Sequence, residues 1–220
     1  MKVIIVGGVA GGATAAARIR RLDEKAEIVI FERTGFISYA NCGLPYFIGD
    51  VINDPDDLTL QSPAGFFRRF RINAKVHHEV VAITPDSKTV TVKNLETGKF
   101  FEESYDKPIL SPAAKPVMLK LNETVRDKVF TLRTVEDTFK IKEYVNRNHP
   151  KTAVLAGGGF ITAVQSLPLD ICKIAASIET AIWLLGVVYA LRRDVSSLVI
   201  HSKSFGNIHD CVQVSGNGCQ

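Results

Sequence analysis

The amino-acid sequence predicts an α/β fold, in which a three-layer domain is built on a parallel sheet and carries an inserted antiparallel β-meander. Three observations support this prediction. A short apolar run leads into a glycine cluster and a helical pattern at the N-terminus, a strand and glycine cluster recur at residues 151–160, and the hydrophobic period becomes two between residues 75 and 105. We expect a first domain at residues 1–149 and a partial or rearranged α/β segment at residues 150–220.

The first group of elements is a βαβ unit. KVIIV (2–6) and EIVIF (27–31) are short apolar runs rich in β-branched residues, as in parallel strands that are buried on both faces. Between them, GGVAGG (7–12) precedes ATAAARIRRLDE (13–24), where small and apolar residues recur at helical spacing. The sequence therefore predicts a strand, a glycine turn, a closely packed helix and a second parallel strand.

The chain after the second strand changes from an irregular pattern to a period of two. Residues 33–74 carry turn signals and partial helical character. Three segments of alternating pattern then predict the β-meander: KVHHEVVAI (75–83), KTVTVKN (88–94) and KFFEESY (99–105).

Two further elements follow the meander. YDKPILS (105–111) is predicted to return to the parallel sheet, with Pro108 at a position that needs no backbone N–H. TVEDTFKIKEYVNRN (134–148) has the pattern of an amphipathic helix, with Thr134 as its N-cap and Pro150 just beyond its end.

Composition excludes several classes of partner. The 27 basic and 23 acidic residues give a net charge of +4, and no basic run exceeds a pair, so we expect no nucleic-acid partner. TAIWLLGVVYAL (180–191) is too short to span a bilayer and predicts a buried helix rather than a membrane segment. The N-terminus has no signal-peptide pattern, and the four cysteines lack metal or disulfide spacing. We expect a cytoplasmic, thiol-reduced protein without a metal.

The first glycine cluster predicts a dinucleotide site. Gly7 and Gly12 are the first and last glycines of a G-x-G-x-x-G pattern, with Val9 at the middle position. Glu32 ends the second strand, 20 residues after Gly12, where an acidic side chain can bind ribose hydroxyls. A tight turn in an ordinary α/β protein is the alternative, but strand, helix and acid all fall in register for a dinucleotide.

The second glycine cluster leaves two interpretations open. Gly157 and Gly159 fit the pattern, but Thr162 occupies the place of the third glycine. The candidate second strand, SSLVIHS (196–202), ends without an acidic residue. A turn that binds nothing well and a nicotinamide site are equally compatible with this sequence.

A single cysteine lies in SYANCGLPYF (38–47), where Cys42 has no partner at C-x-x-C spacing. It is either a small apolar filler or a thiol placed for chemistry. Arg18 and Arg21 lie three residues apart on the predicted first helix. They could bind phosphates or could form a solvated helix face, and the residues alone favour the solvated face.

Several stretches together resemble one family: VIIVGGVAGGATAAARIRRLDE, FER, ISYANCGLPYFIGD, FEESYDKPILSPAAKP and VFTLRTVEDT. They resemble the FAD-dependent pyridine nucleotide-disulfide oxidoreductases, in the single-cysteine branch of coenzyme A-disulfide reductases, their rhodanese-fused relatives and NADH oxidases. The resemblance covers about residues 1–161. It implies an FAD/NAD(P)-binding, Rossmann-like domain, and its two nucleotide motifs would explain the repeated strand and glycine cluster.

The resemblance also implies roles for individual residues. Cys42 would be the redox-active cysteine that faces the flavin. The implied cofactor-binding positions are Gly7, Gly8, Val9, Ala10, Gly11, Gly12, Glu32, Arg33, Asn41, Val80, Ser111, Pro112, Ala113, Arg133, Gly157 and Gly159. The implied substrate-binding positions are Thr14, Arg18, Arg21, Ser38, Asn41 and Arg71.

The implied function is the reduction of a coenzyme A-type or other low-molecular-weight disulfide by NAD(P)H, through FAD and a mixed disulfide of Cys42. Two alternatives remain: oxygen or peroxide reduction of the NADH oxidase type, and a truncated, non-catalytic FAD- or nucleotide-binding protein. The family's members are homodimers, and residues 162–220 resemble neither its later FAD segment nor its dimerisation domain.

Three local positions depart from the family pattern: Pro108, Thr162, and Ala113 where glycine is usual. An alanine at position 113 is strained if the loop requires a positive φ.

Overall fold

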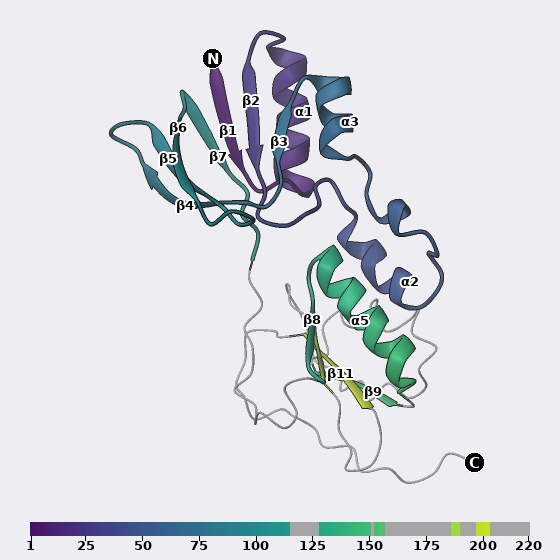
Figure 1. The fold of residues 1–220 in the computed structure, drawn as a ribbon. Helices are drawn as coiled ribbons and strands as arrows, with labels where there is room; N and C mark the ends of the chain where they lie inside the picture. The colour runs from purple at the N-terminus through teal and green to yellow at the C-terminus, as the bar shows by residue number, and fades with distance from the viewer. Residues whose placement is uncertain (115–127, 151, 157–185, 190–196, 203–220) are drawn as a thin grey trace, which may run out of the picture. The chain divides into compact units, whose positions relative to one another are not determined.

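The computed structural model describes residues 1–114, 128–150, 152–156, 186–189 and 197–202. These residues form two compact units that interleave along the chain (Figure 1). The first unit comprises Met1–Ala40 and Asp54–Ala113, and the second comprises Asn41–Asn53 and the chain from Ala114 onward. The boundary expected at residue 150 remains a prediction.

The centre of the first unit is a parallel sheet with the strand order β3-β2-β1-β7. Its strands are β1 (Lys2–Val6), β2 (Glu27–Phe31), β3 (Asn73–Lys75) and β7 (Lys107–Leu110). Ile5 lies opposite Ile30 on one side and Ile109 on the other. Within the described residues β7 is an edge strand, which explains how it accommodates Pro108, as the sequence predicts.

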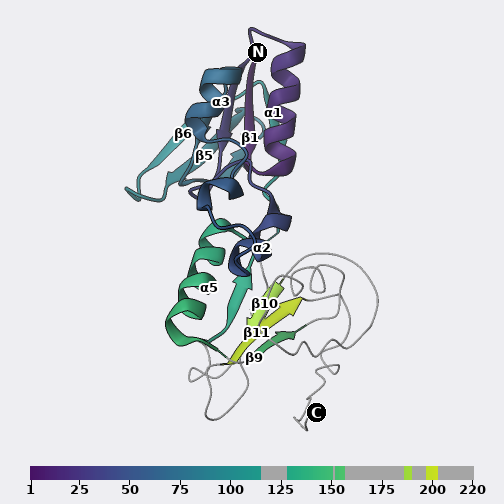
Figure 2. The same ribbon diagram turned by 90° about the vertical axis from the view of Figure 1, so that its right-hand side faces the viewer.

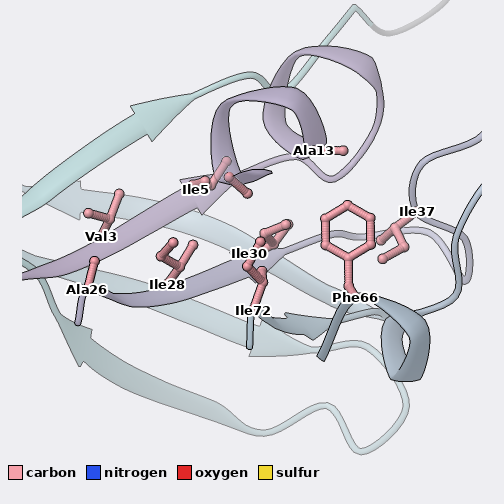
Figure 3. Close-up of a cluster of buried hydrophobic side chains, with 10 residues drawn as sticks. Val3, Ile5, Ala13, Ala26, Ile28, Ile30, Ile37, Phe66 and Ile72 are labelled. Carbon is pink, nitrogen blue, oxygen red and sulfur yellow. The ribbon is translucent and has the colours of Figure 1, made fainter. Parts of the chain in front are cut away.

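Helices cover one face of this sheet. They are α1 (Ala10–Leu22) and α3 (Pro63–Phe70), and the short turn η2 (Pro55–Leu58) precedes α3. Ala13 and Ala16 of α1 and Phe66 of α3 pack on the buried isoleucines of β1 and β2, as Figure 3 shows in part. Burying each such isoleucine stabilises the fold by roughly 1.5–3 kcal/mol.

The predicted β-meander covers the other face and completes the three layers (Figure 1). Its strands are β4 (His78–Thr84), β5 (Thr89–Asn94) and β6 (Phe100–Ser104), paired antiparallel in that order. The single strand expected at residues 75–83 is wrong. Residues 73–75 form β3 in the parallel sheet, and His77 adopts a φ of 54°, which breaks the strand before β4 begins.

The second unit contains its own sheet, with the order β11-β9-β10-β8. The strands are β8 (Phe130–Leu132), β9 (Thr152–Ala156), β10 (Gly186–Tyr189) and β11 (Ser197–Ser202). The strand predicted after the second glycine cluster is confirmed, because β11 pairs in parallel with β9. The buried helix predicted at residues 180–191 is wrong for residues 186–189, because GVVY forms β10. Its β-branched valines suit a strand.

Helices complete the described part of the second unit (Figure 2). They are η1 (Asn41–Gly43), α2 (Leu44–Ile48) and α5 (Val135–Asn148). The predicted N-cap of α5 is confirmed: Thr134 and Asp137 form a reciprocal capping box. No helix among the described residues is long and apolar enough to cross a membrane.

Candidate functional site

The glycine loop after β1 is shaped by close contacts between backbones. Gly7 adopts a φ of 96°, and a Cβ atom there would lie 2.0 Å from the carbonyl oxygen of Ser111. A Cβ atom at Gly12 would lie 1.8 Å from the carbonyl oxygen of Gly7. Only glycine permits these approaches, which bring the ends of β1 and β7 and the start of α1 together.

The N-terminus of α1 has no side-chain cap. Val9 occupies the N-cap position without a side-chain hydrogen bond, and the first turn contains no acidic residue. Ala10 and Gly11 are exposed, so their backbone N–H groups can reach a ligand. The helix dipole and its unpaired N–H groups favour an anion such as a pyrophosphate at this point.

Glu32 lies beside the glycine loop, at the end of β2. Its side chain is buried, and its Oε2 accepts a hydrogen bond from the Gly8 N–H at 2.8 Å. The N–H and the hydroxyl of Thr34 each donate to Oε1 at 2.9 Å. An ionised carboxylate has about four acceptor positions, so the described contacts leave room for a hydroxyl donor. The sequence placed Glu32 correctly but did not anticipate Thr34, which orients it.

Two more of the predicted residues lie at this loop. Ser38 donates its N–H to the carbonyl oxygen of Gly8 at 2.9 Å, which attaches residues 33–40 to the glycine loop. Ser111 donates its N–H to Val6, and its hydroxyl lies 2.6 Å from the position of a Cβ atom on Gly11. Arg33 is half-buried, one residue after Glu32.

The strain predicted at Ala113 is confirmed. Ala113 adopts a φ of 61°, in the left-handed region that favours glycine. Pro112 and Ala113 are both exposed, and they follow Ser111 out of the parallel sheet. The alanine therefore keeps a backbone shape that suits glycine, at a cost of about 1–2 kcal/mol. Val80 lies elsewhere in the first unit: it pairs with Val92 in the meander, beside a register shift.

Three of the predicted substrate residues share one face of α1. Thr14, Arg18 and Arg21 follow the i, i+4, i+7 spacing of a helix face, and all three are exposed. Arg71 is also exposed, at the left-handed C-cap of α3. Arg20 of α1 contacts the end of α3, where its guanidinium donates hydrogen bonds to carbonyl oxygens. The sequence did not predict this contact.

Cys42 belongs to the second unit. It is an exposed free cysteine in η1, directly before α2. Its neighbour Asn41 accepts a hydrogen bond through Oδ1 from Nη1 of Arg133 at 3.2 Å. The Nε of Arg133 is buried and has no hydrogen-bond partner among the described residues. Cys42, Asn41 and Arg133, all predicted as site residues, thus lie together along this contact, and Nε of Arg133 is a buried donor without a partner in the described structure.

The helix after Cys42 packs on α5. The ring of Phe47 contacts that of Phe139 at a centroid distance of 5.7 Å. The Nζ of Lys142 donates to the carbonyl oxygen of Ile48 at 2.9 Å and also binds Asp50. The cysteine segment is therefore attached to β8–α5 at both of its ends, through Arg133 and through Lys142.

Asp137 supports the position of Arg133. Its Oδ2 accepts hydrogen bonds from the N–H groups of Arg133 and Thr134, at 3.1 and 3.2 Å. Burial raises the pKa of the Asp137 carboxyl above its usual range, while these N–H groups oppose the rise. Gly157 and Gly159 lie outside the described residues, and no group of metal ligands occurs within the described part of the chain.

A family model for pyridine nucleotide-disulphide oxidoreductases matches residues 1–182, most of the chain. The chain belongs to this family. The resemblance predicted from the sequence is confirmed, and so are the fold class and the assignment to a family of oxidoreductases.

The relatives of this chain include named enzymes. A coenzyme A disulfide reductase of Staphylococcus haemolyticus is 47% identical over 161 residues, covering 73% of this chain and 36% of the relative. One from Staphylococcus aureus strain JH9 is 44% identical over the same shares. The chain thus spans about a third of the length of these relatives.

Solved structures have the same fold. Reduced CoADR-RHD of Bacillus anthracis matches with a TM-score of 0.74 and 44% identity, over 79% of this chain and 32% of that one. The water-forming NADH oxidase of Lactobacillus brevis, bound to NADH, matches with a TM-score of 0.69 and 30% identity, over 76% and 37%.

Proposed function

We propose that this chain is the FAD-binding and thiol-bearing part of an NAD(P)H-dependent enzyme that reduces coenzyme A-type disulfides. The observation that carries the proposal is the exposed thiol of Cys42, whose neighbour Asn41 is hydrogen-bonded to Arg133. The identity to coenzyme A disulfide reductases supports the substrate class.

The glycine loop suits the ADP half of FAD. Gly7 and Gly12 let the ends of β1 and β7 and the start of α1 pack closely, and the uncapped start of α1 offers N–H donors to a pyrophosphate. Glu32 is a buried acceptor for ribose hydroxyls, and Thr34 holds its carboxylate in place. The other proposed cofactor contacts of the first unit are Gly8, Val9, Ala10, Gly11, Arg33, Val80, Ser111, Pro112 and Ala113. Asn41 and Arg133 are the proposed cofactor contacts of the second unit.

The chemistry of Cys42 is thiol–disulfide exchange. Its thiolate attacks one sulfur of a disulfide RSSR, so that a mixed Cys42–S–S–R bond forms and one RS⁻ leaves and takes up a proton. Bound FAD would carry two electrons from NAD(P)H to this mixed disulfide. Two electrons and a proton release the second RSH and restore the Cys42 thiolate. Asn41 and Arg133 fix the segment that carries the sulfur.

Thr14, Arg18, Arg21, Ser38, Asn41 and Arg71 are the proposed substrate contacts. Guanidinium groups bind phosphates with bidentate, charge-assisted hydrogen bonds, and a coenzyme A disulfide carries several phosphates. Arg18 and Arg21 form no ion pair within the described residues, so their charges are available to such a ligand.

A second candidate is oxygen or peroxide reduction, which the structural match to the NADH oxidase of Lactobacillus brevis favours. Both reactions use a flavin and a thiol. They differ in the acceptor, so parallel assays with coenzyme A disulfide and with oxygen separate them.

The test is a titration of the purified full chain. We expect it to bind FAD, to bleach the flavin absorption with NADH or NADPH, and to release two thiols from each coenzyme A disulfide. A Cys42→Ser variant should bind FAD equally and release no thiol. Bleaching followed by oxygen consumption without thiol release would favour the oxidase. Flavin that does not bleach would leave a non-catalytic FAD-binding protein.

A further inference from the structure

The side chain of Arg20 connects the C-terminal ends of two helices in the first unit. Its Nε donates to the carbonyl oxygen of Phe70 at 2.7 Å, and its Nη2 donates to that of Arg71 at 3.0 Å. Its Nη1 donates to the carbonyl oxygens of Asp23 and Glu24 at 3.2 and 2.6 Å. The last carbonyl groups of a helix lack partners within the helix, so a cation there stabilises both ends at once.

Arg20 differs from the arginines beside it in the sequence. It is half-buried and its guanidinium is occupied by backbone acceptors, whereas Arg18 and Arg21 are exposed. One hundred degrees of rotation per helical residue places positions 18 and 21 on one face and position 20 on another. Three neighbouring arginines therefore divide into two that face solvent and one that contacts α3.

One of the carbonyl groups that accept hydrogen bonds from Arg20 belongs to Arg71. This residue is the C-cap of α3, with a φ of 53° and a ψ of 36°, and its N–H donates to Phe67 at 2.9 Å. Its guanidinium lies over the ring of Phe67, with 5.8 Å between Cζ and the ring centroid. Because a non-glycine residue pays for a left-handed backbone, the contact with Arg20 helps to hold Arg71 in that conformation.

The exposed surface around these residues is basic. Arg68, Arg69 and Arg71 are exposed at the end of α3, which has no acidic residue in its sequence, PAGFFRRF. None of Arg18, Arg21, Arg68, Arg69 and Arg71 forms an ion pair within the described residues. Asp23 forms no ion pair with them within the described residues, and its Oδ1 accepts a hydrogen bond from the N–H of Lys25 at 2.9 Å.

We propose that Arg20 is a positioning residue that holds the Arg71 end of α3 beside the Arg18 and Arg21 face of α1, so that the two helices bind one phosphate-rich ligand. The inference rests on the proposed function, in which that ligand is the phosphorylated adenosine end of a coenzyme A-type disulfide. Arg20 itself makes no contact with the ligand. It acts through the backbone of Arg71.

The test uses the full chain and adenosine 3′,5′-bisphosphate as the probe, with its dissociation constant measured by isothermal titration calorimetry. We expect Arg20→Gln to weaken binding on the order of tenfold, which corresponds to about 1.4 kcal/mol. Lys99→Gln removes one charge from an exposed position before β6, in the layer on the other side of the sheet, and should leave binding within twofold. It controls for the loss of general positive potential.

A double-mutant cycle separates positioning from stability. If Arg20 acts through Arg71, Arg20→Gln in an Arg71→Gln background should add no further loss of affinity, while it still lowers the unfolding midpoint. Fully additive losses of affinity, or unchanged affinity in a folded Arg20→Gln protein, would overturn the inference. If the wild-type chain does not bind the bisphosphate, the α1–α3 ligand site fails. The proposed reaction is tested apart from this, by thiol release from coenzyme A disulfide.

Discussion

Nη1 of Arg133 lies 3.2 Å from Oδ1 of Asn41, across 92 residues of sequence. This contact joins the segment that carries Cys42 to the start of α5, and Lys142 joins the other end of the same segment to α5. The thiol of Cys42 is therefore carried by the second unit, while the glycine loop and Glu32 belong to the first.

The contact between Arg133 and Asn41 should matter for turnover. We expect Asn41→Ala to lower the free energy of unfolding by about 1 kcal/mol, because one hydrogen bond is lost. The rate of thiol release from coenzyme A disulfide should fall on the order of tenfold, because the sulfur is no longer fixed. Lys140→Gln, at an exposed position of α5, serves as the control. Unchanged turnover in Asn41→Ala would contradict a role for this contact.

Ala113 offers a gain in stability. Because its φ is 61°, glycine at this position removes strain, and part of that gain is offset by the greater freedom of the unfolded chain. We expect Ala113→Gly to raise the free energy of unfolding by about 0.5–1 kcal/mol, measured by urea denaturation. Ala64→Gly, at an exposed position of α3, should instead lower it by a similar amount. A destabilised Ala113→Gly protein would contradict this account of the loop.

Gly12 has the shortest backbone approach of the glycines in the first loop. A Cβ atom there would lie 1.8 Å from the carbonyl oxygen of Gly7, so α1 would have to move away from the loop. We expect Gly12→Ala to lower the free energy of unfolding by roughly 1–3 kcal/mol and to abolish the uptake of FAD.

The matched control is Gly98→Ala, at a turn where a Cβ atom would meet nothing within 4 Å. In this variant the positive φ alone should lower the free energy of unfolding, by about 1–2 kcal/mol, and FAD binding should match that of the wild type. If Gly12→Ala retained full FAD binding, the glycine loop would not be the cofactor cradle.

The features that could be predicted from the sequence are those that depend on residues close together in the chain. The glycine turn and Glu32 follow from local spacing, because a parallel βαβ unit fixes where the loop and the end of the second strand meet. The alternating pattern predicted the meander, although the φ of His77 shortened its first strand. Within the helix expected at residues 180–191, residues 186–189 form a strand, because a short apolar run has no period that distinguishes a helix from a strand.

Contacts between distant residues were not predictable in this way. Nothing in the local pattern shows that Arg20 would bind the end of α3, 50 residues away, or that Arg133 would bind Asn41. The packing of helices and strands determines which distant residues meet, and this packing cannot be read from the local pattern of one sequence. Thr34 is the exception: a hydroxyl two residues after an acid can bind it locally, which gives a usable signal.

An ion pair between the parallel sheet and the meander should make stability depend on pH. Glu103 of β6 binds Nζ of Lys2 in β1, and Lys75 lies 3.7 Å from its other oxygen. The hydrogen bond from Lys2 is the main cause that lowers the pKa of Glu103 below its usual 4.5, and the same bond raises the pKa of Lys2 above 10.5. Both side chains are largely shielded from solvent.

Because the pKa of Glu103 is lowered in the folded protein, its ion pair contributes fully to the free energy of unfolding above about pH 4.5. Protonation of the carboxylate removes this stabilisation as the pH falls through the pKa of Glu103 in the folded state. We expect Glu103→Gln to lower the free energy of unfolding by about 1 kcal/mol at pH 7 and by clearly less at pH 3, in urea denaturation. Glu102→Gln, at an exposed neighbouring position without an ion pair in the described structure, should show no such difference. An equal loss at both pH values would mean that Glu103 stabilises the fold by packing rather than by its charge.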